Sequence, residues 1–335
     1  MAPPTKHTDR SVPMADTAHR APHAVPRRSA GAQVRGSSPR RRREAVAGYT
    51  FLIPWFVGLF GITLFPMLYS LYLSFTDYDL LQAPQWVGLE NYVRMLTDDP
   101  QYWNSVKATL LFAVVSVPLK LAVALGVALL LYRDRRGVGL YRALFYVPSL
   151  LGGSVAIAIV WQTLFGGQGA INEVLGFVGI DGRSWITNPS TALGTLVLLA
   201  AWQFGAPMVI FLAGLKQIPT ELFEAGSLDG AGRFKQFWHI TLPMLSPVLF
   251  FNLVLETIAG FQGFTAAFVI SGGTGGPADS TLLYTLYLYL RGFGDFQMGY
   301  ASAMAWGFLL VLGVITAIVF RSGSLWVHYA DEGEH

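Results

Sequence analysis

The sequence predicts an all-α protein: a polytopic membrane helical bundle of about six transmembrane helices with a cytoplasmic helix-loop-helix. Two observations carry this prediction. The 335-residue chain is 53% hydrophobic but only 13% charged, whereas soluble domains contain roughly 25% charged residues. Its apolar residues also gather in windows longer than the about 20 residues that cross a bilayer. This composition excludes a soluble globular protein.

Six apolar windows indicate the spans. The windows without Asp, Glu, Lys or Arg are 45–76, 143–172, 184–215 and 296–320. Two further windows are each broken by one charge, Lys120 in 108–132 and Glu256 in 236–278. We therefore expect a transmembrane domain over 47–322, with spans at 47–75, 106–132, 141–165, 192–215, 244–270 and 299–320.

Residues 1–46 differ from the rest of the chain. They are rich in Pro, Ala, Ser and Arg and show no hydrophobic period, so we expect a disordered basic tail. The tail ends in four arginines, Arg40 to Arg43, directly before the first apolar window. A twin-arginine or secretory signal is an alternative, but the apolar run is about twice as long as a signal core.

Basic residues predict the orientation in the membrane. If the N-terminus is cytoplasmic and six spans alternate, 18 of the 23 basic residues lie in the tail or in cytoplasmic segments. The first outer segment, near 77–104, is acidic. By the positive-inside rule we expect a multi-pass protein of the cell membrane with both termini cytoplasmic. Residues 323–335 would form a short cytoplasmic C-terminal tail.

Several kinds of chemistry have no signature in this chain. It contains no cysteine, and its six histidines show no metal-ligand spacing. We see no nucleophile–base arrangement and no phosphate-binding G-x-x-x-x-G-K-[ST] motif. Ten of the 23 basic residues lie in the first 46, so the net charge of +3 does not indicate nucleic-acid binding. We expect no catalytic site, no metal, no cofactor in this chain and no nucleic-acid partner.

The segment after the fifth span contains a glycine cluster at 271–277 followed by leucines and tyrosines at 281–290. This pattern predicts a mobile turn and then an amphipathic helix lying on the outer membrane surface.

The segment 216–243, between the fourth and fifth spans, predicts two short helices around a glycine break. Thr220 suits a helix start, and Glu221 and Glu224 place negative charge near its positive dipole end. Gly230 can adopt the left-handed conformation that ends a helix. Pro243 marks the start of the fifth span.

This segment also carries a spaced motif. Glu224-Ala225-Gly226, Gly230, Ile240 and Leu242-Pro243 follow the signature E-A-A-x3-G-x9-I-x-L-P, with Gly226 in place of the second alanine. The chain therefore resembles permease subunits of binding-protein-dependent ABC importers over roughly residues 45–322. Trp161, Gly169–Asn172, Gly275–Pro277 and Gly299–Ala303 resemble the carbohydrate type, which serves maltose, oligosaccharides or glycerol phosphate.

The resemblance implies a transport subunit and not an enzyme. The segment 216–243 would be a coupling loop docked on a separate ATPase, which binds ATP and Mg. Glu224 would pair with a basic ATPase residue, Ala225 and Gly226 would allow close approach, and Gly230 would set the turn. The expected partners are a second permease in a heterodimer, two ATPase subunits, an extracytoplasmic solute-binding protein and the lipid bilayer. The expected coupling residues are Glu224, Ala225, Gly226, Asp229, Gly230, Ala231, Ile240, Leu242 and Pro243.

A sugar path needs polar groups for hydroxyls and aromatic faces for pyranose rings. The candidates in spans four to six are Trp202, Gln203, Gln262, Phe264, Tyr300 and Ser302. Each of these could instead pack at a helix interface. Lys120 could line a cavity, pair with Glu256, face a partner helix or snorkel to the membrane surface.

Other functions remain open from the sequence. The cargo could be glycerol phosphate, a polyamine or another small solute. An ion-coupled secondary transporter would need paired intramembrane carboxylates and internal repeats. The sequence shows a single intramembrane carboxylate, Glu256, and no repeat. An exporter permease would lack the coupling motif.

Overall fold

The computed structural model describes residues 39–133, 136–179 and 184–328. The chain divides into two compact units, Met1–Gly58 and Leu59–His335. Over the described ranges the fold is all-α, as predicted, apart from one short antiparallel pair of strands, β1 (Thr76–Asp77) and β2 (Gln85–Trp86).

The first unit contains helix α1 (Pro39–Val57). This helix begins inside the segment 1–46 that we expected to be disordered, so residues 39–46 are helical. Residues 1–38 of the expected tail lie outside the described residues. The apolar helical stretch Gly48–Leu73, which continues through η1 (Gly58–Leu64) and α2 (Phe65–Leu73), is long enough to cross a membrane.

Among the described residues, four helical stretches are long and apolar enough to span a bilayer, and six result if two bent pairs each count as one span. The four are Gly48–Leu73, Pro100–Leu131, Arg233–Ile270 and Met298–Trp326. The bent pairs are α5 (Val138–Leu151) with α6 (Val155–Leu164), and α8 (Pro189–Trp202) with α9 (Gly205–Gln217). This agrees with the predicted bundle of about six spans.

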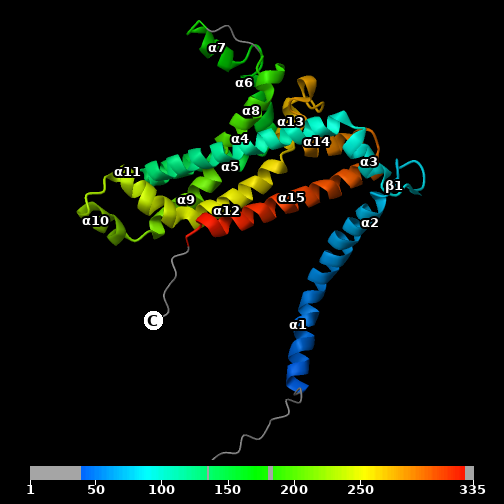
Figure 1. Ribbon diagram of the computed structural model, residues 1–335, viewed down its shortest axis with the longest axis horizontal. Coiled ribbons are helices and arrows are strands. Elements are labelled where there is room, and N and C mark those ends of the chain that lie inside the picture. The colour runs from blue at the N-terminus through cyan, green and yellow to red at the C-terminus, as the bar shows by residue number, and fades with distance from the viewer. Residues whose placement is uncertain (1–38, 134–135, 180–183, 329–335) are drawn as a thin grey trace, which may run out of the picture. The chain divides into compact units, whose positions relative to one another are not determined.

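Helix α4 (Pro100–Leu131) lies at the centre of the second unit. It packs against α8, α9 and α12 (Leu242–Phe261), and α12 in turn packs against α15 (Met298–Trp326). In Figure 1 α4, α12 and α15 run side by side, with α10 (Thr220–Leu228) and α11 (Arg233–Gln236) at one end. Helix α3 (Glu90–Thr97) and β1 lie at the opposite end.

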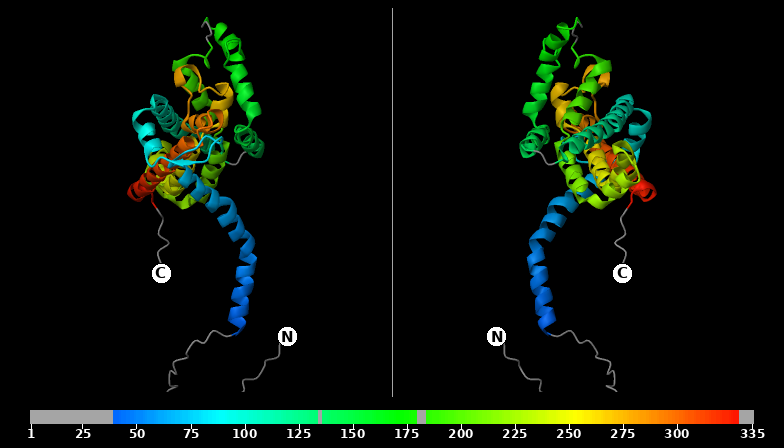
Figure 2. Two further views of the ribbon diagram at one scale, coloured as in Figure 1. Left: turned by 90° about the vertical axis from the view of Figure 1, so that its right-hand side faces the viewer. Right: turned by 90° about the vertical axis from the view of Figure 1, so that its left-hand side faces the viewer.

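The predicted third span, 141–165, is not one straight helix. Helices α5 and α6 meet at an angle of 98°. The turn contains Gly152 and Gly153, and Ser154 then starts α6 by accepting a hydrogen bond on Oγ from the Ile157 N–H at 3.3 Å. A serine N-cap favours a new helix start over continuation of the old helix. Helix α6 leads away from α12 and α15, and helix α7 (Ala170–Gly176) follows beyond its far end in all three views (Figures 1 and 2).

We expected the helix after the glycine cluster to lie on the membrane surface. This prediction is wrong, because the helix is buried. The segment forms α13 (Thr265–Ile270), η3 (Pro277–Asp279), α14 (Tyr284–Tyr289) and η4 (Leu290–Gly294). Tyr284, Leu286 and Tyr287 of α14 are buried in the core. Burial of these large side chains stabilises the fold more than an interfacial position would. At the other end of the chain, α15 extends to Trp326, beyond the expected boundary at 322.

Candidate functional site

The segment with the spaced motif folds as a hairpin of two short helices, α10 and α11. Helix α10 ends in a Schellman motif. The N–H of Gly230 donates to the carbonyl oxygen of Ser227 at 3.1 Å, and the N–H of Ala231 donates to that of Gly226 at 2.8 Å. Gly230 has a φ of +77°, as this ending requires. The predicted left-handed role of Gly230 is thereby confirmed.

The second helix of the hairpin, α11, holds α10 in place through hydrogen bonds. The side-chain amide of Gln236 donates to the carbonyl oxygen of Phe223 at 3.3 Å and to Oγ of Ser227 at 2.9 Å. Ile240 lies in η2 (Phe237–Thr241) and approaches Gly226 so closely that a Cβ there would be 3.0 Å from Ile240 Cδ1. Leu242 and Pro243 then open α12. The motif residues therefore belong to one folded unit.

The outward face of this hairpin carries both acidic and apolar side chains. Glu224 and Asp229 are exposed. Leu228 is 90% exposed and Phe234 is 79% exposed. The rings of Phe234 and Trp238 pack edge to face, with their centroids 6.3 Å apart. Large exposed apolar side chains are typical of surfaces that bind a partner.

A second candidate site is a cavity of about 220 Å³ inside the bundle. It lies between α4, α8, α12 and the turn that joins α5 to α6. Of the predicted substrate-path residues, Gln203 and Phe264 line this cavity. Polar lining residues outside that prediction are Ser116, Lys120, Glu256 and Thr265.

Lys120 and Glu256 form an ion pair across the bundle. Nζ of Lys120 lies 2.8 Å from Oε2 of Glu256, and the two side chains are 16% and 15% exposed. Of the alternatives that the sequence left open for Lys120, the structure shows two: it pairs with Glu256 and it lines the cavity. The ion pair joins α4 to α12, two helices that are distant in the sequence.

The other predicted path residues lie elsewhere among the described residues. Trp202 packs against Trp161 with ring centroids 6.0 Å apart. Gln262 is exposed, and Ser302 is half-buried in α15. Tyr300 is buried, and its hydroxyl donates to Asp99. Their roles in substrate passage stay predictions.

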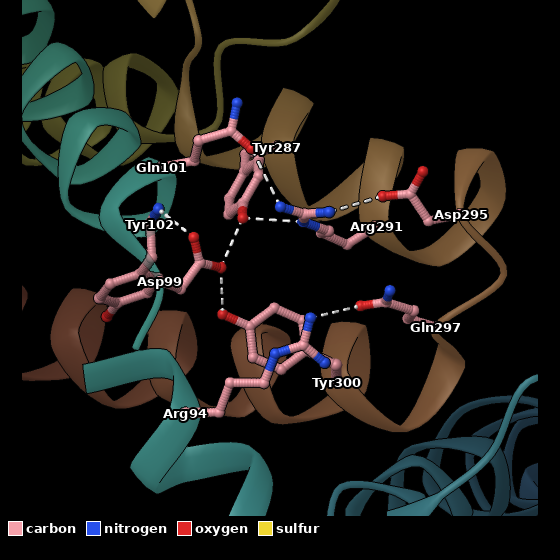
Figure 3. A network of polar contacts seen from close by, with 9 residues as sticks. All are labelled: Arg94, Asp99, Gln101, Tyr102, Tyr287, Arg291, Asp295, Gln297 and Tyr300. Carbon is pink, nitrogen blue, oxygen red and sulfur yellow. Dashed lines mark hydrogen bonds and ion pairs between the residues drawn. The ribbon is translucent and has the colours of Figure 1, made fainter. Parts of the chain in front are cut away.

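Asp99 is the centre of a polar network at the end of the bundle opposite α10 (Figure 3). Its Oδ2 accepts hydrogen bonds from the hydroxyls of Tyr287 and Tyr300, both at 2.5 Å. Its Oδ1 accepts from the backbone N–H of Tyr102 at 3.1 Å and so caps α4. Arg291 donates to the Tyr287 hydroxyl at 2.8 Å.

The charge of Asp99 is stabilised by this network. Burial by itself raises the pKa of the carboxyl group. The hydrogen bonds that it accepts, together with the positive charge of Arg291, outweigh burial and hold its pKa below the ordinary value. Burial, followed by the hydrogen bond to Asp99, raises the pKa of Tyr287. Asp99 is therefore an anion that ties α4, α14 and α15 together.

Sequence reasoning did not single out Asp99 or Tyr287. The signal was present, because an aspartate directly before a proline fits an N-cap followed by the first helical position. Nothing in the local pattern shows which tyrosines reach that carboxylate. In the described residues, no group of three or more His, Asp or Glu side chains could hold a metal ion.

Comparison with known proteins identifies relatives along most of the chain. Residues 120–328 match the family of binding-protein-dependent transport system inner membrane components. The probable ABC transporter permease protein YesP of Bacillus subtilis (strain 168) is 52% identical over 305 residues, covering 91% of this chain and 99% of the relative. The lactose transport system permease protein LacF of Rhizobium radiobacter is 32% identical over 289 residues, covering 84% and 96%.

A solved structure has the same fold. It is the crystal structure of a bacterial alginate ABC transporter in complex with its alginate pentasaccharide-bound periplasmic protein. A chain of that complex aligns with a TM-score of 0.72 and 20% identity, and the alignment covers 84% of this chain and 94% of the other.

Proposed function

Because the chain belongs to the family of inner membrane components of binding-protein-dependent transport systems, as a permease subunit of a carbohydrate ABC importer, we propose that it carries a di- or oligosaccharide into the cell. An extracytoplasmic binding protein would deliver that sugar. The observation that carries the proposal is the hairpin of α10 and α11, whose motif residues fold together and whose outer face is exposed. The lactose permease among the relatives supports a disaccharide as cargo.

The hairpin is the proposed docking site for an ATPase subunit. Glu224 on the exposed face of α10 would pair with a basic residue of the ATPase, while Leu228 would enter an apolar part of its cleft. ATP and Mg would bind to the ATPase and not to this chain. A second permease in a heterodimer and two ATPases would complete the importer. With α10 in the cytoplasm, both termini would be cytoplasmic.

The packing of the hairpin suggests how ATP hydrolysis on the ATPase would shift the helices that line the cavity. Helices α9 and α12 flank the hairpin in the sequence, and both pack against α4. The hydrogen bonds from Gln236 and the Gly226–Ile240 contact make the hairpin a stiff unit. A displacement of α10 would therefore reach α12 and α4, which carry Glu256 and Lys120 at the cavity.

The cavity argues against a phosphate as cargo. Among its lining residues Lys120 is the basic one, and its charge is balanced by Glu256 at 2.8 Å. A doubly charged phosphate would favour several uncompensated basic groups. An ion-coupled transporter is not favoured either, since the relatives are ABC permeases.

A reconstituted importer tests this proposal. ATPase activity would be measured with the cognate binding protein and a panel of lactose, maltose and trehalose. We expect one sugar to stimulate hydrolysis. We expect Glu224→Ala to lower the stimulated rate about tenfold, because removing a hydrogen bond between charged groups costs roughly 1.5 kcal/mol or more.

The matched control is Glu221→Ala, which removes the same charge one turn earlier on the same helix. Its stimulated rate should stay near that of the wild type. Equal losses in both variants would show that general negative charge, and not Glu224, matters for coupling. No stimulation of the wild type by any sugar would contradict a disaccharide cargo.

A further inference from the structure

A second cavity, of about 240 Å³, lies between α4 and α15 beside α3. Its wall includes Leu96 of α3, Val106 and Leu110 of α4, and Phe308 and Val311 of α15. Leu110 is 41% exposed and Val311 is 50% exposed, so the cavity opens toward the surroundings of the bundle. It shares no lining residue with the cavity at the ion pair.

Three polar side chains in the wall already have partners within the protein. Oγ1 of Thr109 accepts a hydrogen bond from the Tyr284 N–H at 2.7 Å and donates within α4 at 2.8 Å. The Tyr284 hydroxyl donates to the Met304 carbonyl oxygen at 2.8 Å, and the Trp103 indole N–H donates to that of Leu96 at 3.0 Å. A ligand rich in hydroxyl groups would lose its bonds to water here and find few replacements, whereas an apolar ligand gains from burial.

The cavity begins at the expected edge of the membrane. Helix α4 starts at Pro100, and its apolar window begins at residue 108. Trp103 lies just before this window, and tryptophans gather where lipid meets water. Leu110 lies about 10 Å further along the helix axis. The cavity therefore leads from the level of the lipid headgroups into the hydrocarbon region.

Lys107 places a positive charge beside the opening. It is exposed. It lies four residues after Trp103 and three before Leu110, and residues at these spacings are neighbours on a helix surface. In the part of the chain that the structure describes, its ammonium group has no hydrogen-bond or ion-pair partner. A lysine at the membrane surface can bind a phosphate group as a point charge.

An acyl chain fits this cavity better than a protein helix does. A helix with its side chains is about 10 Å across, so it would cover the opening without entering it. Apolar cavities of about 150 Å³ hold a benzene molecule, so this cavity has room for part of one acyl chain. The exposed side chains of Leu111 and Val114 continue the apolar surface of α4 beyond Lys107.

We propose that this cavity is a phospholipid-binding site, in which one acyl chain fills the space between α4 and α15 and the phosphate group lies at Lys107. The lipid belongs to the leaflet on the side of α3. Its chain packs against Tyr284, which joins α14 to α4 and α15. The bound lipid therefore braces the place where these three helices meet, whatever the cargo of the protein is.

Photolabelling in vesicles tests the site. The complete importer would be reconstituted into phosphatidylethanolamine and phosphatidylglycerol, with a phosphatidylglycerol probe that carries a diazirine on one acyl chain. We expect the label at Leu110 and Val311, and we expect excess unlabelled phosphatidylglycerol to suppress it. Ile318 is the reference, because it is an exposed residue elsewhere on α15. Label at Val311 that is no stronger than at Ile318 would overturn the proposal.

A matched pair of variants tests the acyl-chain position. Leu110→Trp narrows the cavity, whereas Leu111→Trp adds the same bulk to the next residue, which is exposed and does not line the cavity. We expect Leu110→Trp to lower the label at Val311 at least about fivefold, because part of the apolar contact is lost. Leu111→Trp should keep the wild-type label. Equal labelling in the two variants would contradict the site.

The headgroup position is tested at Lys107. Lys107→Gln should weaken the suppression by unlabelled phosphatidylglycerol by at least about threefold, because it removes a charge-assisted contact. Lys107→Arg keeps the charge and should behave like the wild type. Unchanged suppression in Lys107→Gln would overturn the assigned phosphate position. This pair decides the question if Leu110→Trp does not assemble.

A benzophenone amino acid at position 110 distinguishes a lipid from a protein as the occupant. Cross-linking to phospholipid in the assembled importer would support the proposal. Cross-linking to a second subunit instead would show that a protein covers the opening, and the lipid site would be wrong.

Discussion

Gly152 illustrates how one residue sets the position of a side chain in the cavity lining. The Gln203 amide donates to the Gly152 carbonyl oxygen at 3.2 Å. A Cβ on Gly152 would lie 2.2 Å from Cδ of Gln203, far inside van der Waals contact. Any side chain at position 152 would therefore displace Gln203. Its neighbour Gly153 also lines the cavity, but a Cβ there would meet nothing within 4 Å.

These two glycines give a residue-scale prediction. Gly152→Ala should lower sugar uptake about fivefold, because displacement of Gln203 removes one polar contact worth roughly 1 kcal/mol. Gly153→Ala should transport like the wild type. Uptake by the importer in proteoliposomes measures both. Similar uptake in the two variants would mean that Gln203 does not contact the cargo.

Gly226 gives a physical reason for the one departure from the family signature. An alanine Cβ at this position would be 3.0 Å from Ile240 Cδ1, so glycine allows the closest approach of α10 to η2. A glycine inside a helix costs up to about 1 kcal/mol relative to alanine. The close packing and the two Gln236 hydrogen bonds offset that cost in this hairpin.

At the scale of elements, Asp99 holds the ends of three helices together. Its carboxylate caps α4 and accepts hydrogen bonds from Tyr287 next to η4 and from Tyr300 near the start of α15. Arg94 of α3 stacks over the Tyr300 ring at 4.5 Å. These contacts join segments about 200 residues apart without any strand pairing, so the helix ends depend on one buried anion.

We predict that this network makes stability depend on pH. The pKa of Asp99 is lower in the folded state, so its contribution is complete above the ordinary pKa of an aspartate. It is lost as the pH falls through the lower folded-state pKa. Asp99→Asn should destabilise the chain by about 1.5–3 kcal/mol at pH 7. The difference from the wild type should shrink as the pH falls below about 4.

Thermal unfolding of the purified protein across this pH range is the measurement. Asp98→Asn is the control, because Asp98 is the exposed neighbour of Asp99, and its effect should stay within about 0.5 kcal/mol. A destabilisation by Asp99→Asn that is the same at pH 3 and pH 7 would show that the charge of Asp99 contributes nothing.

At the scale of the whole molecule, the second unit separates its two candidate sites along the bundle. The hairpin of α10 and α11 is at one end, and the cavity lies deeper between the two apolar clusters. Helices α4, α9 and α12 connect them by side-chain packing. Since packed cores respond as units and do not deform continuously, we expect a force on α10 to change the cavity.

The orientation of this bundle in the membrane can be predicted from its charges. Basic residues cluster on the side of α10, so this side should be cytoplasmic. In intact cells, a membrane-impermeant maleimide should label Thr97→Cys and should leave Ser227→Cys unlabelled until the cells are opened. The cysteine-free chain makes each label specific. The reverse labelling pattern would contradict cytoplasmic termini.

Much of this architecture was predictable because it depends on local properties. A run of apolar residues defines a span whatever its neighbours are, and the charge-free windows at 184–215 and 296–320 predicted helices that the structure contains. The Schellman ending at Gly230 also follows from nearby residues. A kink in the third span was predictable, because Pro148 lies within it and a proline frees a backbone carbonyl. The 98° angle between α5 and α6 was not predicted, because two glycines and a serine within an apolar run are also compatible with a much straighter membrane helix.

The sequence by itself determined the all-α membrane class, the number of spans within the limits of the bends, and the position and turn of the hairpin of α10 and α11. Only the tertiary structure decided that Lys120 pairs with Glu256, that Tyr300 binds Asp99 and that α14 is buried. The physical reason is that membrane helices are apolar on every side, so their periodicity does not show which face meets which neighbour. Partner choice across 136 residues, as for Lys120 and Glu256, is set by the packing of whole helices.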